Sequence, residues 1–352
     1  MKSNRWRKRL AVCVALSGLL LGPSSGAFSD SEDTTTFDVD GATYGTFPAS
    51  INEGGAIAGT YRDASFTLRA FVRDKHGAVT KFDAPGSSFG TFIGPFDINE
   101  GGTVVGSFFD ATYSLSHGFV RDKSGTATTL DVPGAGGLFF GGTFAVSING
   151  AGIITGYYYD AFGATHGFVR DKLGNFSTID VSGATDGTFA LSINDEGTIT
   201  GHYFAGGAGH GFVRDKDGAI TPFDALNSGN AYPTGINAEG AITGYYYGTN
   251  GSPHSFVRDK HGVITSFDDP AAGNAFNVGT LPSGINEDGE IVGTYVDTQF
   301  LNHGFVRSRR GSIKNFDAPG LLTFPMSIND EGAITGNYCA AVGPCHGFVR
   351  TE

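Results

Sequence analysis

The sequence predicts an all-β protein, a β-propeller of seven blades in which each blade is a four-stranded antiparallel sheet. The first observation is repetition, because the string Phe-Val-Arg occurs seven times at intervals of 43 to 49 residues, a length typical of propeller blades. The second is composition, since 56 glycines and 30 phenylalanines in 352 residues favour many turns around an aromatic core. The third is the way the two ends of the chain complement one another.

Each repeat reads as four short strands rich in aromatic and β-branched residues. In the third repeat the strands are expected at residues 143–149, 153–159, 166–170 and 175–180. The first strand ends in an Ile-Asn pair followed by Gly three residues after the Asn, the pattern of a type I turn. This pair ends at Asn52, Asn99, Asn149, Asn194, Asn237, Asn286 and Asn329. The turn between the third and fourth strands uses Asp in place of Asn in five repeats, as in Asp171 to Gly174.

The two ends of the chain each supply part of one blade. The segment 34–39 reads as a fourth strand that no first three strands precede, whereas the chain ends after three strands, the last at 345–350. We therefore expect strand 34–39 to pair with strand 345–350 and close the ring, which removes two exposed sheet edges. Residues 28–352 are then a single propeller domain.

Residues 1–27 have the features of a signal peptide: basic residues precede an apolar run at 10–21, and small residues end it at Ala27. The alternative is an uncleaved N-terminal anchor. We expect a secreted or periplasmic protein with no membrane-spanning segment in the mature chain. Cleavage would leave 18 basic and 35 acidic residues, a net charge of 18 − 35 = −17. This charge argues against nucleic acid as a partner.

Cysteine usage fits an oxidising compartment. Cys13 lies in the signal peptide, and the two remaining cysteines, Cys339 and Cys345, are predicted to form a disulfide. A metal pair is the alternative, but further thiol ligands are lacking. No cofactor is expected, and the sequence has no Asp-x-Asp-x-Asp-Gly calcium loop.

The repeated His-Gly-Phe-Val-Arg string, with variants at 69–71 and 254–256, and the pattern Ile-Asn-x-x-Gly-x-Ile-x-Gly-x-Tyr resemble the probable extracellular HAF repeat family. The resemblance covers essentially the whole mature chain, although Gly replaces the family's central Ala in most copies. It implies an exported repeat protein and identifies no catalytic residues.

Residues that recur in every repeat are expected to be structural. The histidines that start the third strands are expected to hydrogen-bond within or between blades, and the Phe-Val-Arg arginines to pair with the aspartates that end the fourth strands, such as Asp83 or Asp180. On the innermost strands, the residue just before the Ile-Asn pair is Ser or Gly in six repeats and Asp97 in the remaining one. Asp97 is therefore a weak candidate for a catalytic or channel-lining carboxylate.

The face opposite the tight hairpins, called the variable face below, carries the connections from second to third and from fourth to first strands. Function concentrates in such loops. The binding candidates there are Asp110, Tyr113, Tyr157, Asp160, His202 and Tyr245. Carboxylates among tyrosine rings suit neutral carbohydrate, whereas the alternative is that the tyrosines pack between blades and the aspartates are solvated. His202 is also a weak candidate for a general acid or base.

The predicted function is that of a secreted, non-enzymatic, monomeric binding protein whose partner is an extracellular glycan or protein. One alternative is a polysaccharide hydrolase or lyase that uses carboxylates near Asp97, Asp110 and Asp160, which would require two of them in one cleft. The other is a structural component of the cell surface.

Overall fold

The structure, a computed structural model, describes residues 34–87, 96–110, 115–137, 141–226 and 228–351. These residues form strands and turns, with no helix among them. The predicted signal peptide, residues 1–27, lies outside the described residues, as does the candidate Tyr113.

Three antiparallel sheets of four strands are separate from one another. They consist of β14 (Thr188–Ile193), β15 (Ile199–Ala205), β16 (Ala208–Arg214) and β17 (Ile220–Phe223); of β18 (Tyr232–Ile236), β19 (Ile242–Tyr247), β20 (Pro253–Arg258) and β21 (Ile264–Phe267); and of β22 (Thr280–Ile285), β23 (Ile291–Val296), β24 (Asn302–Arg307) and β25 (Ile313–Phe316). Each is a meander of the kind that the repeats predict.

Two further sheets have eight strands, and in each a short parallel bridge joins two antiparallel groups of four. One joins β2 (Gly45–Ile51), β3 (Ile57–Arg62), β4 (Leu68–Arg73) and β5 (Val79–Phe82) to β26 (Leu322–Ile328), β27 (Ile334–Cys339), β28 (Cys345–Arg350) and β1 (Thr34–Phe37) through Gly45 and Cys345. The other joins β6 (Asp97–Ile98), β7 (Val104–Phe109), β8 (Leu115–Arg121) and β9 (Ala127–Leu130) to β10 (Gly141–Ile148), β11 (Ile154–Tyr159), β12 (Thr165–Arg170) and β13 (Phe176–Ile179) at the start of β10.

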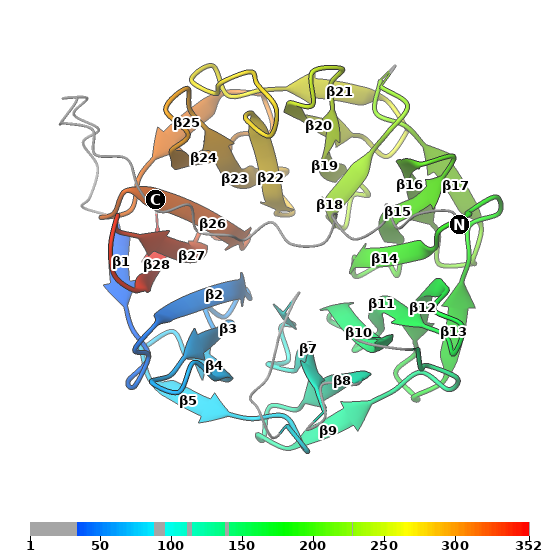
Figure 1. Ribbon diagram of the computed structural model, residues 1–352, viewed down its shortest axis with the longest axis horizontal. Helices are drawn as coiled ribbons and strands as arrows, with labels where there is room; N and C mark the ends of the chain where they lie inside the picture. Colours follow the sequence, from blue (N-terminus) through cyan, green and yellow to red (C-terminus); the bar gives the residue numbers. More distant parts are fainter. Residues whose placement is uncertain (1–33, 88–95, 111–114, 138–140, 227, 352) are drawn as a thin grey trace, which may run out of the picture.

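The sheets are arranged around a common axis, with the first strand of each meander innermost and the fourth at the periphery (Figure 1). The phenylalanine of every Phe-Val-Arg string is fully buried, because it points into the space between neighbouring sheets. At the chain ends, β1 pairs antiparallel with β28, from Thr34 opposite Arg350 to Phe37 opposite Gly347. The strand ends at Phe37, two residues before the predicted limit.

The asparagines of the Ile-Asn pairs link each four-stranded group to the next. The Oδ1 atom of each accepts the backbone N–H of the residue four positions later, while its Nδ2 donates to the backbone carbonyl of the next such asparagine, as from Asn194 to Asn237 at 2.8 Å. The other links are Asn52 to Asn99, Asn99 to Asn149, Asn149 to Asn194, Asn237 to Asn286, Asn286 to Asn329 and Asn329 back to Asn52. The chain of hydrogen bonds returns to its starting residue.

The histidines that begin the third strands pair with the aspartates that end the fourth strands. His166 Nδ1 lies 2.8 Å from Asp180 Oδ1, and His346 Nδ1 lies 2.8 Å from Asp38, so one such pair joins the two ends of the chain. The remaining pairs are His117 with Asp131, His210 with Asp224, His254 with Asp268 and His303 with Asp317. The expectation of hydrogen bonds within or between blades is confirmed for these histidines.

The predicted pairing of the Phe-Val-Arg arginines with the same aspartates is wrong. Asp180 accepts from His166, and Asp83 accepts from Arg69, which replaces histidine in the first repeat. Six of the seven arginines instead lie over phenylalanine rings, as Arg307 does over Phe267 at 4.6 Å. A guanidinium over an aromatic face is stabilised by a cation–π interaction without a carboxylate.

Candidate functional site

On the variable face, the connections between second and third strands are as tight as the hairpins of the opposite face, whereas most of those from fourth to first strands are longer. In the turn after β11 the Gly163 N–H donates to the Asp160 carbonyl at 3.0 Å. The Asp160 carboxylate accepts the N–H groups of Phe162 and Ala164, which together with nearby His166 lower its pKa. Asp160 thus stabilises its own turn, and ligand contact by Asp160 stays a prediction.

Asp97 is bound on both sides by neighbouring strands. Its carboxylate accepts Ser50 Oγ at 2.8 Å from β2, and Ser147 Oγ at 2.9 Å and the Ile148 N–H at 3.0 Å from β10. These contacts tie β2, β6 and β10 together near the axis and account for a carboxylate at this position without a ligand. Asp110 lies at the end of β7, where its N–H donates to the Leu115 carbonyl at 3.0 Å.

The structure brings three of the predicted residues, Tyr157, His202 and Tyr245, into one group of aromatic side chains. We call this group the aromatic arc. It spans three consecutive sheets and consists of Phe144, Tyr157, Tyr159, Phe189, His202, Phe204, Tyr232, Tyr245 and Tyr247. All nine are half-buried, so each keeps part of its surface exposed to solvent.

The arc is built from cross-strand pairs. Each first strand places an aromatic ring opposite the residue that follows the second-strand glycine: Phe144 opposite Tyr157, Phe189 opposite His202 and Tyr232 opposite Tyr245. The rings in each pair stack, with centroids 4.8, 5.0 and 5.2 Å apart respectively. Edge-to-face contacts then join the sheets, from Tyr157 to Phe189 at 5.0 Å and from His202 to Tyr232 at 5.4 Å.

Among the residues that the structure describes, the arc is confined to these three sheets. The same two positions hold Phe47 with Thr60, Leu281 with Thr294, and Phe324 with Asn337 in other sheets. The fold therefore accepts threonine or asparagine at the position after the second-strand glycine. It does not require a tyrosine there. Sequence reasoning missed Phe144 and Phe189, although an aromatic residue five positions before the Ile-Asn asparagine was a visible signal.

His202 lies at the centre of the arc as a neutral imidazole. Burial lowers its pKa to about 4, and its Nδ1 atom is buried with no hydrogen-bond partner among the described residues. A group with this pKa is poorly matched to acid–base catalysis near pH 7. The same neutral ring can stack and offer a hydrogen-bonding nitrogen, which suits a binding role.

The hydroxyls of three tyrosines in the arc are also neutral. Burial raises the pKa of Tyr157, Tyr159 and Tyr245 above the ordinary tyrosine value. The ring of Tyr232 lies directly against Gly209 of β16, where a Cβ atom would overlap it, so the glycine at this position is explained by packing. The arc is therefore an uncharged surface of rings, phenolic hydroxyls and one imidazole.

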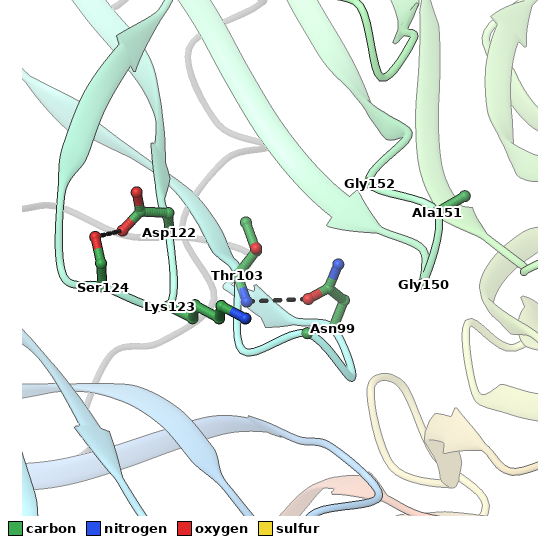
Figure 2. A pocket seen from close by; sticks show the side chains of 9 residues that line it. Asn99, Thr103, Asp122, Lys123, Ser124, Gly150, Ala151 and Gly152 are labelled. Carbon is green, nitrogen blue, oxygen red and sulfur yellow. Dashed lines mark hydrogen bonds between the residues drawn. The ribbon is translucent and has the colours of Figure 1, made fainter.

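A shallow depression of about 460 Å³ lies on the opposite face, between the turns that follow β6, β8 and β10. Figure 2 shows Thr103 donating its N–H to Asn99 Oδ1 at 3.0 Å and Ser124 donating to Asp122 at 2.6 Å. These contacts belong to the turns that every repeat contains. The depression therefore reflects the spacing of these three turns and offers no distinctive chemistry.

On the same face, acidic residues that follow the asparagines bridge neighbouring sheets. The Glu53 N–H donates to Glu100 at 2.7 Å, and the Asp330 N–H donates to Glu53 at 2.8 Å. Asp195 and Glu287 accept backbone N–H groups in the same way. The described residues contain no group of three or more His, Cys, Asp or Glu side chains arranged to hold a metal ion.

Replacing Glu53 by Gln is expected to stabilise the protein at pH 8. Burial raises the pKa of Glu53 from 4.5 to about 7, with Asp330 and Glu100 adding repulsion. The folded state then binds more protons than the unfolded state between these values, so stability falls as pH rises from about 4.5 to about 7. We expect Glu53→Gln to raise the Tm by roughly 2–4 °C at pH 8, and by much less at pH 5, in calorimetry.

The exposed Glu196, changed to Gln, is the matched control and should leave the Tm unchanged at both pH values. An equal effect of Glu53→Gln at pH 5 and pH 8 would contradict the interpretation.

No protein-family model and no curated protein sequence matches this chain. Among solved structures, the chain is similar to a streptogramin B lyase, with 14% identity and a TM-score of 0.62 over 91% of this chain and 97% of that one. It is also similar to virginiamycin B lyase from Staphylococcus aureus, with 12% identity and a TM-score of 0.59 over 91% and 99%, and to puromycin hydrolase, with 12% identity and a TM-score of 0.56 over 85% and 51%.

These neighbours are β-propeller proteins, and with the antiparallel four-stranded sheets they establish a propeller fold for this chain. At identities of 12–14% the likeness extends to the fold alone.

Cys339 and Cys345 form the predicted disulfide, across the ends of β27 and β28. Within the described ranges we find no helix of the length and apolarity needed to cross a membrane.

Proposed function

We propose that this chain is an exported propeller of seven four-stranded blades, closed into a ring by its two ends, that binds an uncharged glycan on its variable face. Each eight-stranded sheet divides at its parallel bridge into two meanders, which with the three separate sheets supports seven blades. Pairing of β1 with β28, and the asparagine hydrogen bonds that run from Asn329 back to Asn52, support closure.

Export is supported by the disulfide between Cys339 and Cys345, since such bonds persist in oxidising compartments. The predicted signal peptide points to the same location, outside the cytoplasm. Membership in the HAF repeat family remains part of this proposal and rests on the repeated sequence motifs.

The binding role rests on one observation, which is that the arc joins rings on three sheets into a single, partly exposed and uncharged surface. Sugars present flat apolar faces and hydroxyl groups together, and aromatic rings with nearby polar atoms match both. An uncharged arc favours an uncharged ligand, because burial of an ion against it would leave that ion without a counter-charge.

A binding role is favoured over glycoside hydrolysis because two of the three candidate carboxylates, Asp97 and Asp160, are engaged within the fold. Asp97 accepts hydrogen bonds from two neighbouring strands, and Asp160 accepts two N–H groups of its own turn. Hydrolysis by the usual route requires two carboxyl groups that face one scissile bond.

The decisive experiment changes the arc without changing the fold. We expect Tyr157→Thr and Tyr245→Thr each to weaken binding of soluble neutral oligosaccharides about fivefold in calorimetric titration of residues 28–352, because each removes a stacking ring worth about 1 kcal/mol. Threonine is chosen because Thr60 and Thr294 stand at equivalent positions in other sheets. The oligosaccharides are taken from a neutral glycan array on which the wild-type protein is first screened.

Thr294→Ser, at the equivalent position outside the arc, is the control and should keep wild-type affinity. Wild-type protein that binds no neutral glycan on the array, or tyrosine variants that bind as tightly as wild type, would overturn the proposal.

A further inference from the structure

Three phenylalanines project from hairpin tips on the variable face. Phe66, Phe162 and Phe300 lie in the turns after β3, β11 and β23, and their exposed fractions are 61%, 96% and 70%. Single exposed apolar residues are ordinary in proteins. Here, however, large exposed rings recur at the tips of equivalent hairpins, which is a pattern typical of an interaction surface.

The backbone gives a second, independent indication. Phe66 and Phe300 have positive φ angles of 60° and 65°, a conformation that is unfavourable for a bulky L-residue. Equivalent turns place glycine at this position, at Gly163 and Gly251, with the same hydrogen bond from its N–H to the first residue of the turn. Glycine would therefore suit the fold better at these two positions, so the fold itself does not explain Phe66 and Phe300.

The three tips are widely separated. The strands that flank them, β3 and β4, β11 and β12, and β23 and β24, lie on different sides of the axis in Figure 1. All three hairpins join second to third strands, so they lie on one face of the propeller, the variable face. A small ligand cannot contact all three tips, whereas a broad surface can.

Charge favours one kind of surface. Each hairpin carries an aspartate, Asp63, Asp160 or Asp297, whose carboxylate accepts N–H groups of its own turn. Arg69 and these N–H groups lower the pKa of Asp63, so the charge beside Phe66 persists. With a whole-chain net charge of −12, these carboxylates oppose anionic lipid and resist desolvation in a bilayer.

We infer that Phe66, Phe162 and Phe300 form a docking surface for an insoluble, uncharged polysaccharide, against whose sugar faces the three rings pack. This inference rests on the proposed glycan-binding function and adds that the natural ligand is a polymer surface contacted at several points. Phe66 also stacks on Tyr44, with ring centroids 3.8 Å apart, which extends the apolar contact at that tip.

The test uses residues 28–352 in sedimentation assays with cellulose, chitin and curdlan. The triple variant takes residues from sister hairpins: Phe66→Gly and Phe300→Gly follow Gly163 and Gly251, and Phe162→Asn follows Asn250. We expect at least a tenfold loss of partitioning onto the polymer that the wild type binds. The Tm should stay at or above the wild-type value, since two unfavourable φ angles are relieved.

Leu173, which is 80% exposed on the opposite face, supplies the control Leu173→Asn, which should bind the polymer normally. Unchanged partitioning of the triple variant, or wild-type protein that binds none of the three polymers, overturns the inference. Binding to phosphatidylcholine vesicles that the triple variant loses would overturn it in favour of a lipid surface.

The two proposals fail separately. Loss of soluble oligosaccharide binding in the Tyr157→Thr and Tyr245→Thr variants tests the arc, whereas the phenylalanine variant should keep that affinity and lose only the polymer. Wild-type protein that binds soluble glycan but none of the three polymers would contradict only the proposed docking surface.

Discussion

Deletion of residues 28–37 is expected to lower the Tm by more than about 10 °C, because it removes the strand that covers the outer edge of β28. β1 pairs with four residues of β28, and Phe37 lies beside Phe71 and beneath Arg73. Loss of Phe37 alone should cost about 3 kcal/mol through lost burial and packing. The deletion also leaves the final sheet without its fourth strand, so the ends of the chain could separate.

The measurement is thermal unfolding of the truncated and the intact protein, with Thr36→Ser as the control, since this exposed side chain changes little while the strand is kept. A fall of less than about 2 °C in the truncated protein would show that the proposed ring closure does not stabilise the fold. Aggregation of the truncated protein is a further expected result, because β28 then presents an unpaired edge.

The propeller fold was predictable because its signals are local and repeated. Alternating apolar residues, glycines at fixed turn positions and the fully buried phenylalanine of each repeat are all visible in the sequence. The end of β1 was less predictable. Val39 leaves the strand because its N–H donates to Thr46 Oγ1 of β2 at 3.1 Å, a side-chain contact that strand propensities do not reveal.

The partners of repeated polar residues could not be assigned from sequence. Arginine and histidine both lie on the third strand, and either could reach the aspartate that ends the fourth. In the structure, His166 lies directly above Asp180, whereas Arg170 extends over Phe176. The choice depends on position along the hairpin: Asp180 follows Ile179, which pairs with Gly167 beside His166, whereas Arg170 pairs with Phe176 at the other end. A tally of residue types does not contain that information.

The candidate site was predictable only in part. Tyr157, His202 and Tyr245 share one repeat position, so their equivalence could be read from the sequence. Their assembly into one arc also depends on the ring of the first strand, such as Phe189, which stacks on His202 and contacts Tyr157 of the preceding sheet. Contacts between sheets of this kind follow from the propeller arrangement and from no local pattern.

The turn after the first strand starts with asparagine, whereas the turn after the third strand starts with aspartate in most repeats. This difference has a structural cause. The turn after the third strand starts with aspartate, as at Asp171, whose Oδ1 accepts the N–H groups of Leu173 and Asn175. The turn after the first strand needs the same acceptor, and Asn194 Oδ1 supplies it to Thr198. Only asparagine adds a donor, which Asn194 directs at the Asn237 carbonyl of the next sheet.

Replacing the asparagine by aspartate should therefore lower the free energy of unfolding much more than replacing the aspartate by asparagine. We expect Asn194→Asp to lower the free energy of unfolding by about 2–4 kcal/mol in urea denaturation. The residue is buried, the amide donor is lost, and a carboxylate is brought beside the carbonyl of Asn237. Asp171→Asn, in an exposed turn that keeps its Oδ1 acceptor, should change it by less than about 0.5 kcal/mol. Equal effects of the two substitutions would contradict a linking role for the asparagines, because turn formation alone accepts either residue.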